Sequence, residues 1–68
     1  MYYLRLVTSH GGNDIIAENI PDVESAVKAL ADARRVYFSS KGDVNYTDLF
    51  ATYSNGHESA RLSIEQGA

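Results

Sequence analysis

The two histidines are the side chains best suited to chemistry near neutral pH, because an imidazole can exchange a proton or bind a metal ion there. His10 and His57 each stand beside a glycine in a segment with turn composition, and neither belongs to an HExxH or HxH spacing. The chain has no cysteine, which excludes thiol catalysis, disulfides and cysteine-ligated zinc. We therefore expect two solvated turn histidines, no metal site, no catalytic site and a non-enzymatic protein.

Two adjacent glycines, Gly11 and Gly12, raise the question of a phosphate-binding loop. Such loops carry the spacing GxGxxG or GxxxxGK[ST] and lead directly into a helix, whose N-terminus binds the anion. Neither spacing is present, and the residues that follow are typical of a strand. The pair is explained by a turn, and we expect no cofactor.

Tyrosine is abundant, with five in 68 residues, and arginine stands at outward positions of two predicted strands. Tyrosine and arginine are enriched at the hot spots of protein interfaces. The candidate partner-binding residues are Tyr3, Arg5, Tyr37, Tyr46 and Arg61. The alternative, which the sequence leaves open, is that the aromatic residues only stabilise the sheet through cross-strand pairs.

Direct binding of nucleic acid is not expected from the charge. Affinity for nucleic acid depends on a basic surface that contacts phosphates. The chain has 6 Lys and Arg against 9 Asp and Glu, a formal net charge of −3. Arg34 and Arg35 with Lys41 form the one small basic cluster, and a protein partner fits the composition better.

The first half of the chain predicts a β-hairpin followed by a helix. Residues 2–8 alternate at period two and are rich in aromatic and β-branched types, residues 10–13 have turn composition, and residues 14–20 resume a strand. Asp22 is a good N-cap, and the apolar residues after it recur at helical spacing as far as residue 34. The helix is therefore predicted over residues 22–34.

The second half predicts three further strands. We expect them at residues 36–40, 49–54 and 58–65, with a turn at 41–43 and the hairpin signal Asn55-Gly56 between the last two. The result is an α+β fold, an antiparallel sheet packed by a single helix in the order β-β-α-β-β-β. A rival interpretation places a short helix between Thr47 and Asn55.

The alternation also predicts which side chains face the helix and which face away. The inward set is Leu4, Leu6, Val36, Phe38, Ala60, Leu62 and Ile64. The outward set is Tyr3, Arg5, Val7, Tyr37, Arg61 and Phe50. The segment 41–48, with Tyr46 among polar neighbours, is a second candidate contact region.

Length and hydropathy limit the class of protein. Residues 1–68 are enough for one domain, and the apolar runs are too short to cross a membrane. Residues 1–5 lack the basic and apolar regions of a signal peptide. We therefore expect a cytoplasmic protein that does not bind a membrane. Domains of this size often need a staple such as an oligomer partner, and a homo-oligomer remains an open alternative.

In layout the chain resembles small phage-encoded inhibitors of bacterial defence, including some type I anti-CRISPR proteins. The resemblance rests on a hairpin from Tyr2 to Ile20, a helix that begins after Pro21-Asp22, the segment Arg35-Val36-Tyr37-Phe38 and the Asn55-Gly56 hairpin. It implies a non-catalytic protein that binds and blocks a host effector complex, and it transfers no functional residue. The alternative functions are a homo-oligomeric accessory or regulatory subunit and, ranked below it, a small nucleic-acid-binding domain.

Overall fold

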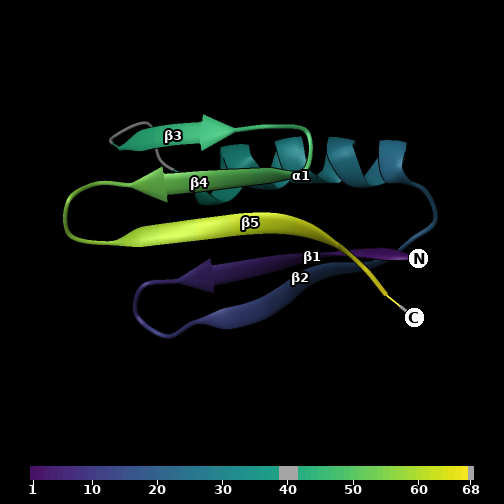
Figure 1. Ribbon diagram of the computed structural model, residues 1–68, viewed down its shortest axis with the longest axis horizontal. Coiled ribbons are helices and arrows are strands. Elements are labelled where there is room, and N and C mark those ends of the chain that lie inside the picture. Colours follow the sequence, from purple (N-terminus) through teal and green to yellow (C-terminus); the bar gives the residue numbers. More distant parts are fainter. Residues whose placement is uncertain (39–41, 68) are drawn as a thin grey trace.

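The structure is a computed structural model that describes residues 1–38 and 42–67. Within these residues it has one helix and a five-stranded antiparallel sheet in the order β-β-α-β-β-β, which confirms the predicted α+β fold (Figure 1). The strands are β1 (Tyr2–Thr8), β2 (Asn13–Ile20), β3 (Asp43–Tyr46), β4 (Phe50–Ser54) and β5 (Ser59–Gln66), and the helix α1 spans Val23–Tyr37.

The sheet has the strand order β2-β1-β5-β4-β3, so the last strand of the chain lies in the middle. All neighbouring strands are antiparallel. Helix α1 packs on β5, β1, β2 and β4 and lies behind the sheet in Figure 1. The other face of the sheet carries no element of the described chain. No helix within residues 1–38 and 42–67 is long and apolar enough to cross a membrane.

Helix α1 begins where the sequence predicts. The Asp22 carboxylate accepts a hydrogen bond of 2.7 Å from the Ser25 backbone N–H, which satisfies one of the free donors at the helix start. Ala26 and Leu30, one turn apart, are 0% and 3% exposed and face the sheet. The predicted N-terminus and apolar stripe of the helix are therefore confirmed.

The predicted strand at residues 36–40 is wrong, because the helix continues through Tyr37. Val36, predicted to face inward, is 78% exposed on the helix surface. Phe38 is buried as predicted, but as the C-cap of the helix, with its ring 5.5 Å from that of Tyr53. Burial of this ring at the helix end outweighs the β-propensity of the preceding residues. The last two predicted positions lie outside the described residues.

The third strand is β3, which lies in the segment predicted as a turn and a polar loop. Val44 packs against the core from this strand, while Asp43 and Asn45 point away from it and give the segment its loop-like composition. The predicted strand at 49–54 is confirmed, since β4 covers all but its first residue and no helix forms there. The rival short helix is therefore wrong.

The core lies between α1 and the sheet. Its buried members are Leu4, Ile20, Ala26, Leu30, Phe38, Ala51 and Leu62. Of the residues predicted to face inward, Leu6, Ala60 and Ile64 are partly buried and pack against this cluster. Because side chains alternate along a strand, the neighbours of these core residues must point to the opposite face.

Candidate functional site

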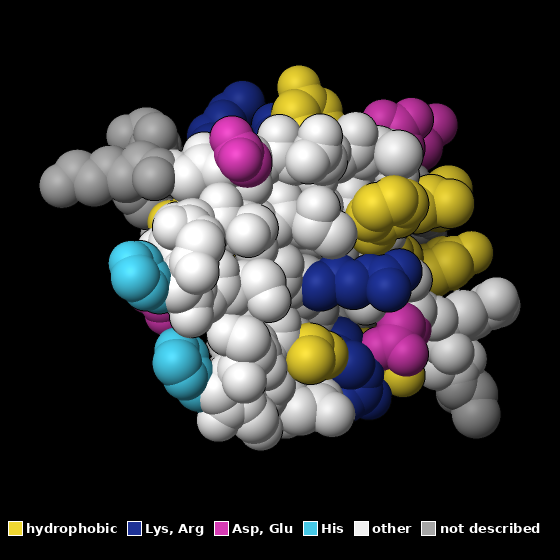
Figure 2. Space-filling model, turned by 60° about the vertical axis from the view of Figure 1, so that its left-hand side comes forward, with side chains coloured by type: hydrophobic (Ala, Val, Ile, Leu, Met, Phe, Trp, Pro, Cys, Tyr) yellow, Lys and Arg dark blue, Asp and Glu magenta, His cyan; other side chains and the backbone are white. Residues whose placement is uncertain are grey.

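Both histidines lie in turns at one end of the sheet, as predicted (Figure 2). His10 Nε2 is 3.3 Å from Glu58 Oε2, and the two side chains are 70% and 53% exposed. Residues 1–38 and 42–67 hold no group of three or more metal-ligating side chains. The histidines thus form part of a solvated surface, with one exposed pair between two turns.

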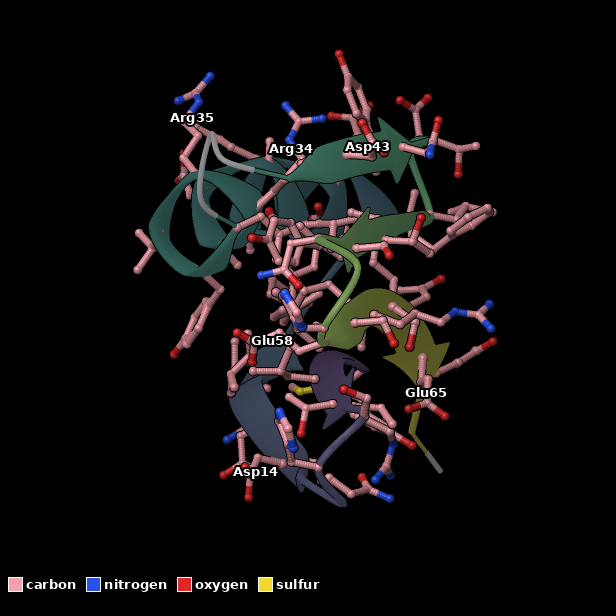
Figure 3. All side chains as sticks on the ribbon, turned by 90° about the vertical axis from the view of Figure 1, so that its left-hand side faces the viewer. Asp14, Arg34, Arg35, Asp43, Glu58 and Glu65 are labelled. Atoms are coloured by element: carbon pink, nitrogen blue, oxygen red, sulfur yellow. The ribbon has the colours of Figure 1, made fainter. Side chains whose placement is uncertain are left out.

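The sheet face opposite α1, which we call the open face, is covered by no element of residues 1–38 and 42–67. Leu4 pairs with Ile64 and Leu6 with Leu62 on the helix side, so the residues between them point outward. The side chains that point outward on the open face include Tyr3, Arg5, Val7, Asp43, Asn45, Phe50, Thr52, Arg61, Ser63 and Glu65. Figure 3 shows the sheet from its end, with α1 on one side and Glu65 on the other.

Arg5 is held in place on the open face by two side chains. Its Nε donates to Glu65 at 2.5 Å and its Nη1 donates to Asn13 at 2.5 Å. The hydrogen bond to Glu65 raises the pKa of the Arg5 guanidinium above its usual value. The same guanidinium lies 5.7 Å from the centre of the Tyr3 ring. Arg5 is therefore oriented before any partner arrives, which lowers the entropy that binding would cost.

Arg61 is arranged differently. Its guanidinium lies over the Phe50 ring at 5.3 Å, and no carboxylate of the described residues pairs with it. A guanidinium stacked on an aromatic ring keeps its N–H donors free for a carboxylate. Arg61 thus offers an unpaired cation on an apolar support.

Beside Arg61 the open face is shallowly hollowed, with a volume of about 510 Å³. The hollow is lined in part by Val7, Asn45, Thr52 and Ser54. Figure 2 shows charged and hydrophobic side chains close together, next to a broad area that has neither. Aromatic residues and arginine, which lie together here, are enriched at protein interfaces.

Three of the five candidate partner-binding residues come together on the open face: Tyr3, Arg5 and Arg61. Tyr37 does not, because it stands in the last turn of α1 and is 51% exposed there. Its predicted place on the outer sheet face is therefore wrong. Tyr46 lies on the helix side of β3, where the Arg34 guanidinium stacks 3.5 Å from its ring centre.

Sequence reasoning missed Glu65 and Ser63 as parts of this surface. Both alternate with buried residues of β5, so their orientation was readable from the period-two pattern. The contacts of these two residues cannot be predicted from the pattern, because Arg5 and Glu65 are 60 residues apart in the sequence. They meet only through the pairing of β1 with β5. No local signal indicates that the last strand lies in the middle of the sheet.

Comparison with protein-family models, with curated proteins and with solved structures finds no match.

Proposed function

We propose that the chain is a non-enzymatic protein-binding module that acts through the open face. One observation carries this proposal: no element of residues 1–38 and 42–67 covers the open face, which presents Arg61 stacked on Phe50 beside the oriented Arg5. Such aromatic and arginine side chains contribute most of the binding energy in many interfaces. A protein partner supplies the carboxylates and apolar groups that fit these side chains.

The finer form of the proposal names the kind of partner. On the resemblance in layout, the chain acts in the bacterial cytoplasm as a phage or mobile-element inhibitor that blocks a defence complex by binding it. The size of the chain supports a contact role over a pocket, since the core uses the helix and one sheet face. The exposed His10–Glu58 pair gives no enclosed site for a substrate.

A binding experiment with matched charge reversals tests the proposal. The tagged chain is incubated with bacterial lysate, and the retained proteins are compared for wild type, Arg61→Glu and Arg35→Glu. Arg35 is a suitable control because its side chain is 74% exposed on α1, away from the open face, and its reversal changes the net charge equally. We expect wild type and Arg35→Glu to retain the same protein and Arg61→Glu to lose it.

Equal retention by all three proteins would overturn the open face as the contact surface. Retention of no protein by wild type would count against a heterologous partner.

A second candidate function is a homo-oligomeric accessory or regulatory subunit, in which a second copy covers the open face. The observation in its favour is the length of the chain, 68 residues without a cysteine, because domains of this size often gain stability from a partner subunit.

A further inference from the structure

A cleft opens on the helix side of the sheet, where the C-terminal end of α1 lies against the ends of β1 and β5. Its volume is about 330 Å³, and we call it the end cleft. Its floor is apolar, since Leu6 and Ala60 line it and also pack against the core. Figure 3 looks onto this end of the molecule, with α1 and the labelled Asp14 of β2 on opposite sides of Glu58.

Three of the side chains that line the end cleft are aromatic: Tyr37, Phe38 and Tyr53. Tyr37 is 51% exposed in the last turn of α1. The rings of Phe38 and Tyr53 are stacked with their centres 5.5 Å apart. Aromatic rings attract a cation that lies over them, and they also cover the apolar stem of a long side chain.

The end cleft is bordered by one carboxylate. The Glu58 side chain is 53% exposed, and its Oε2 lies 3.3 Å from His10 Nε2. The described residues that line the cleft include no lysine and no arginine. A neutral imidazole can donate a hydrogen bond to a carboxylate and leave its negative charge in place. The charge of Glu58 is therefore available to a cation that enters the cleft.

The end of α1 adds to this negative potential. The C-terminus of a helix carries a partial negative charge, which basic residues of the last turn can compensate. Arg34 stacks 3.5 Å from the centre of the Tyr46 ring, and Arg35 pairs with Asp32 at 3.6 Å. Neither arginine lines the end cleft. Carboxylate, rings and helix end therefore all favour a positively charged ligand.

The turns that carry the polar wall are fixed by hydrogen bonds. The Asn55 side-chain oxygen accepts from the backbone N–H groups of His57 and Glu58, at 3.0 and 2.9 Å. The Ser9 backbone N–H donates to the Ser59 carbonyl at 2.8 Å, and the Ser59 N–H donates to the Ser9 hydroxyl at 3.0 Å. The backbone that carries Glu58 is thus ordered before a ligand arrives, which lowers the entropy cost of binding.

We propose that the end cleft binds an arginine side chain of a partner protein. The guanidinium donates to the Glu58 carboxylate and stacks on the aromatic wall, while its apolar stem lies on Leu6 and Ala60. A planar guanidinium can form a forked pair with a carboxylate and stack on a ring, whereas the ammonium of lysine is compact and strongly hydrated. The site lies on the helix side of the sheet, and it rests on the proposed function only in that a bound protein supplies the arginine.

NMR titration with N-acetyl-arginine amide tests the site directly. N-acetyl-citrulline amide is the control ligand, because it has nearly the same shape without the positive charge. We expect saturable shifts of the Tyr37, Glu58 and Ala60 signals with the arginine derivative, and binding of the citrulline derivative at least about tenfold weaker. Equal binding of the two ligands overturns a cation site, and tighter binding of N-acetyl-lysine amide overturns the choice of arginine.

Two pairs of matched variants locate the binding groups. Glu58→Gln should weaken binding of the arginine derivative at least about tenfold, whereas Glu24→Gln, the same change in the first turn of α1, should leave it unchanged. Tyr37→Ala should weaken it about threefold, whereas Tyr46→Ala removes an exposed ring outside the cleft and should have no effect. Circular dichroism that matches wild type shows that each variant still folds.

The outcomes separate the end cleft from the open face. Equal affinity of wild type and Glu58→Gln for the arginine derivative overturns the cleft, while the open face still stands if Arg61→Glu loses a partner and Arg35→Glu keeps it. In the same lysate experiment, Glu58→Gln should retain less of the partner than Glu24→Gln. Equal retention by these two variants overturns a partner arginine in the cleft.

Discussion

Two adjacent residues of β5, Leu62 and Arg61, should differ strongly in how much stability the chain loses when each is replaced by alanine. Leu62 is 0% exposed on the middle strand, opposite Leu6 and Ala51 in the registers of β1 and β4. Arg61 points to the open face. Replacement of each by alanine therefore tests directly which face of the sheet holds the core.

For Leu62→Ala we expect the free energy of unfolding to fall by about 3 to 5 kcal/mol, because the lost methyl groups leave a cavity that the sheet cannot close. At roughly 0.05–0.15 kcal/mol per residue, a chain of this length has a total stability of about 3–10 kcal/mol. The variant should thus be close to unfolded at room temperature. For Arg61→Ala the change should stay within about 0.5 kcal/mol, as for most surface sites.

Urea unfolding followed by circular dichroism measures both variants, at protein concentrations low enough that self-association adds nothing. The two slopes with urea should match wild type if the native fold is kept. A loss above 2 kcal/mol for Arg61→Ala, or a loss below 1 kcal/mol for Leu62→Ala, would refute the assignment of the two faces.

Three further predictions concern the helix ends and the start of β3. In Gly42→Ala the new Cβ would meet the Tyr53 ring and lie 2.9 Å from a β4 carbonyl oxygen, so thermal unfolding should show a loss of about 1–3 kcal/mol; an unchanged midpoint contradicts this packing. The Asp22 carboxyl has a lowered pKa because it accepts the backbone hydrogen bond at the helix start. Its contribution to stability is present above its usual pKa of about 4 and is lost as the pH falls through the lower folded value, so wild type should lose stability relative to Asp22→Asn on acidification, and parallel pH curves would contradict the cap. In chemical denaturation, the free energy of unfolding should fall by about 3–5 kcal/mol for Phe38→Ala, because a buried ring is removed. It should hardly change for Val36→Lys, because Val36 is exposed on the helix. The reverse order would support a strand at residues 36–40 and contradict the helix.

The sequence pattern was sufficient for the elements whose burial has a clear period. Strand β5 alternates between outward polar residues and inward Ala60, Leu62 and Ile64, and α1 has a capping residue and one apolar stripe. The end of α1 was not predictable from propensity, because Val36-Tyr37-Phe38 has the composition of a strand. At this end Phe38 packs against Tyr53, a contact between distant residues that local propensity does not contain.

The sequence predicts a sheet face that carries tyrosine and arginine, but it does not predict all the residues that lie there. Tyr3, Arg5 and Arg61 were identified because alternation alone fixes their side of a strand. Tyr37 was placed on this face because residues 36–40 were predicted as a strand, whereas Tyr37 lies in helix α1. The pairing of Arg5 with Glu65, and the position of Ser63 at the centre of the face, follow from strand order, which no local pattern in this sequence specifies.

Amide NMR spectra of the wild-type chain, recorded alone and with increasing amounts of the protein that it retains from bacterial lysate, test most directly that the open face is a protein contact surface. The account predicts that the signals of Arg61, Ser63 and Phe50 shift or broaden as the partner is added, while those of Lys28 and Asp32 on the outer side of α1 stay in place. Shifts confined to the helix would contradict the open face as the contact surface.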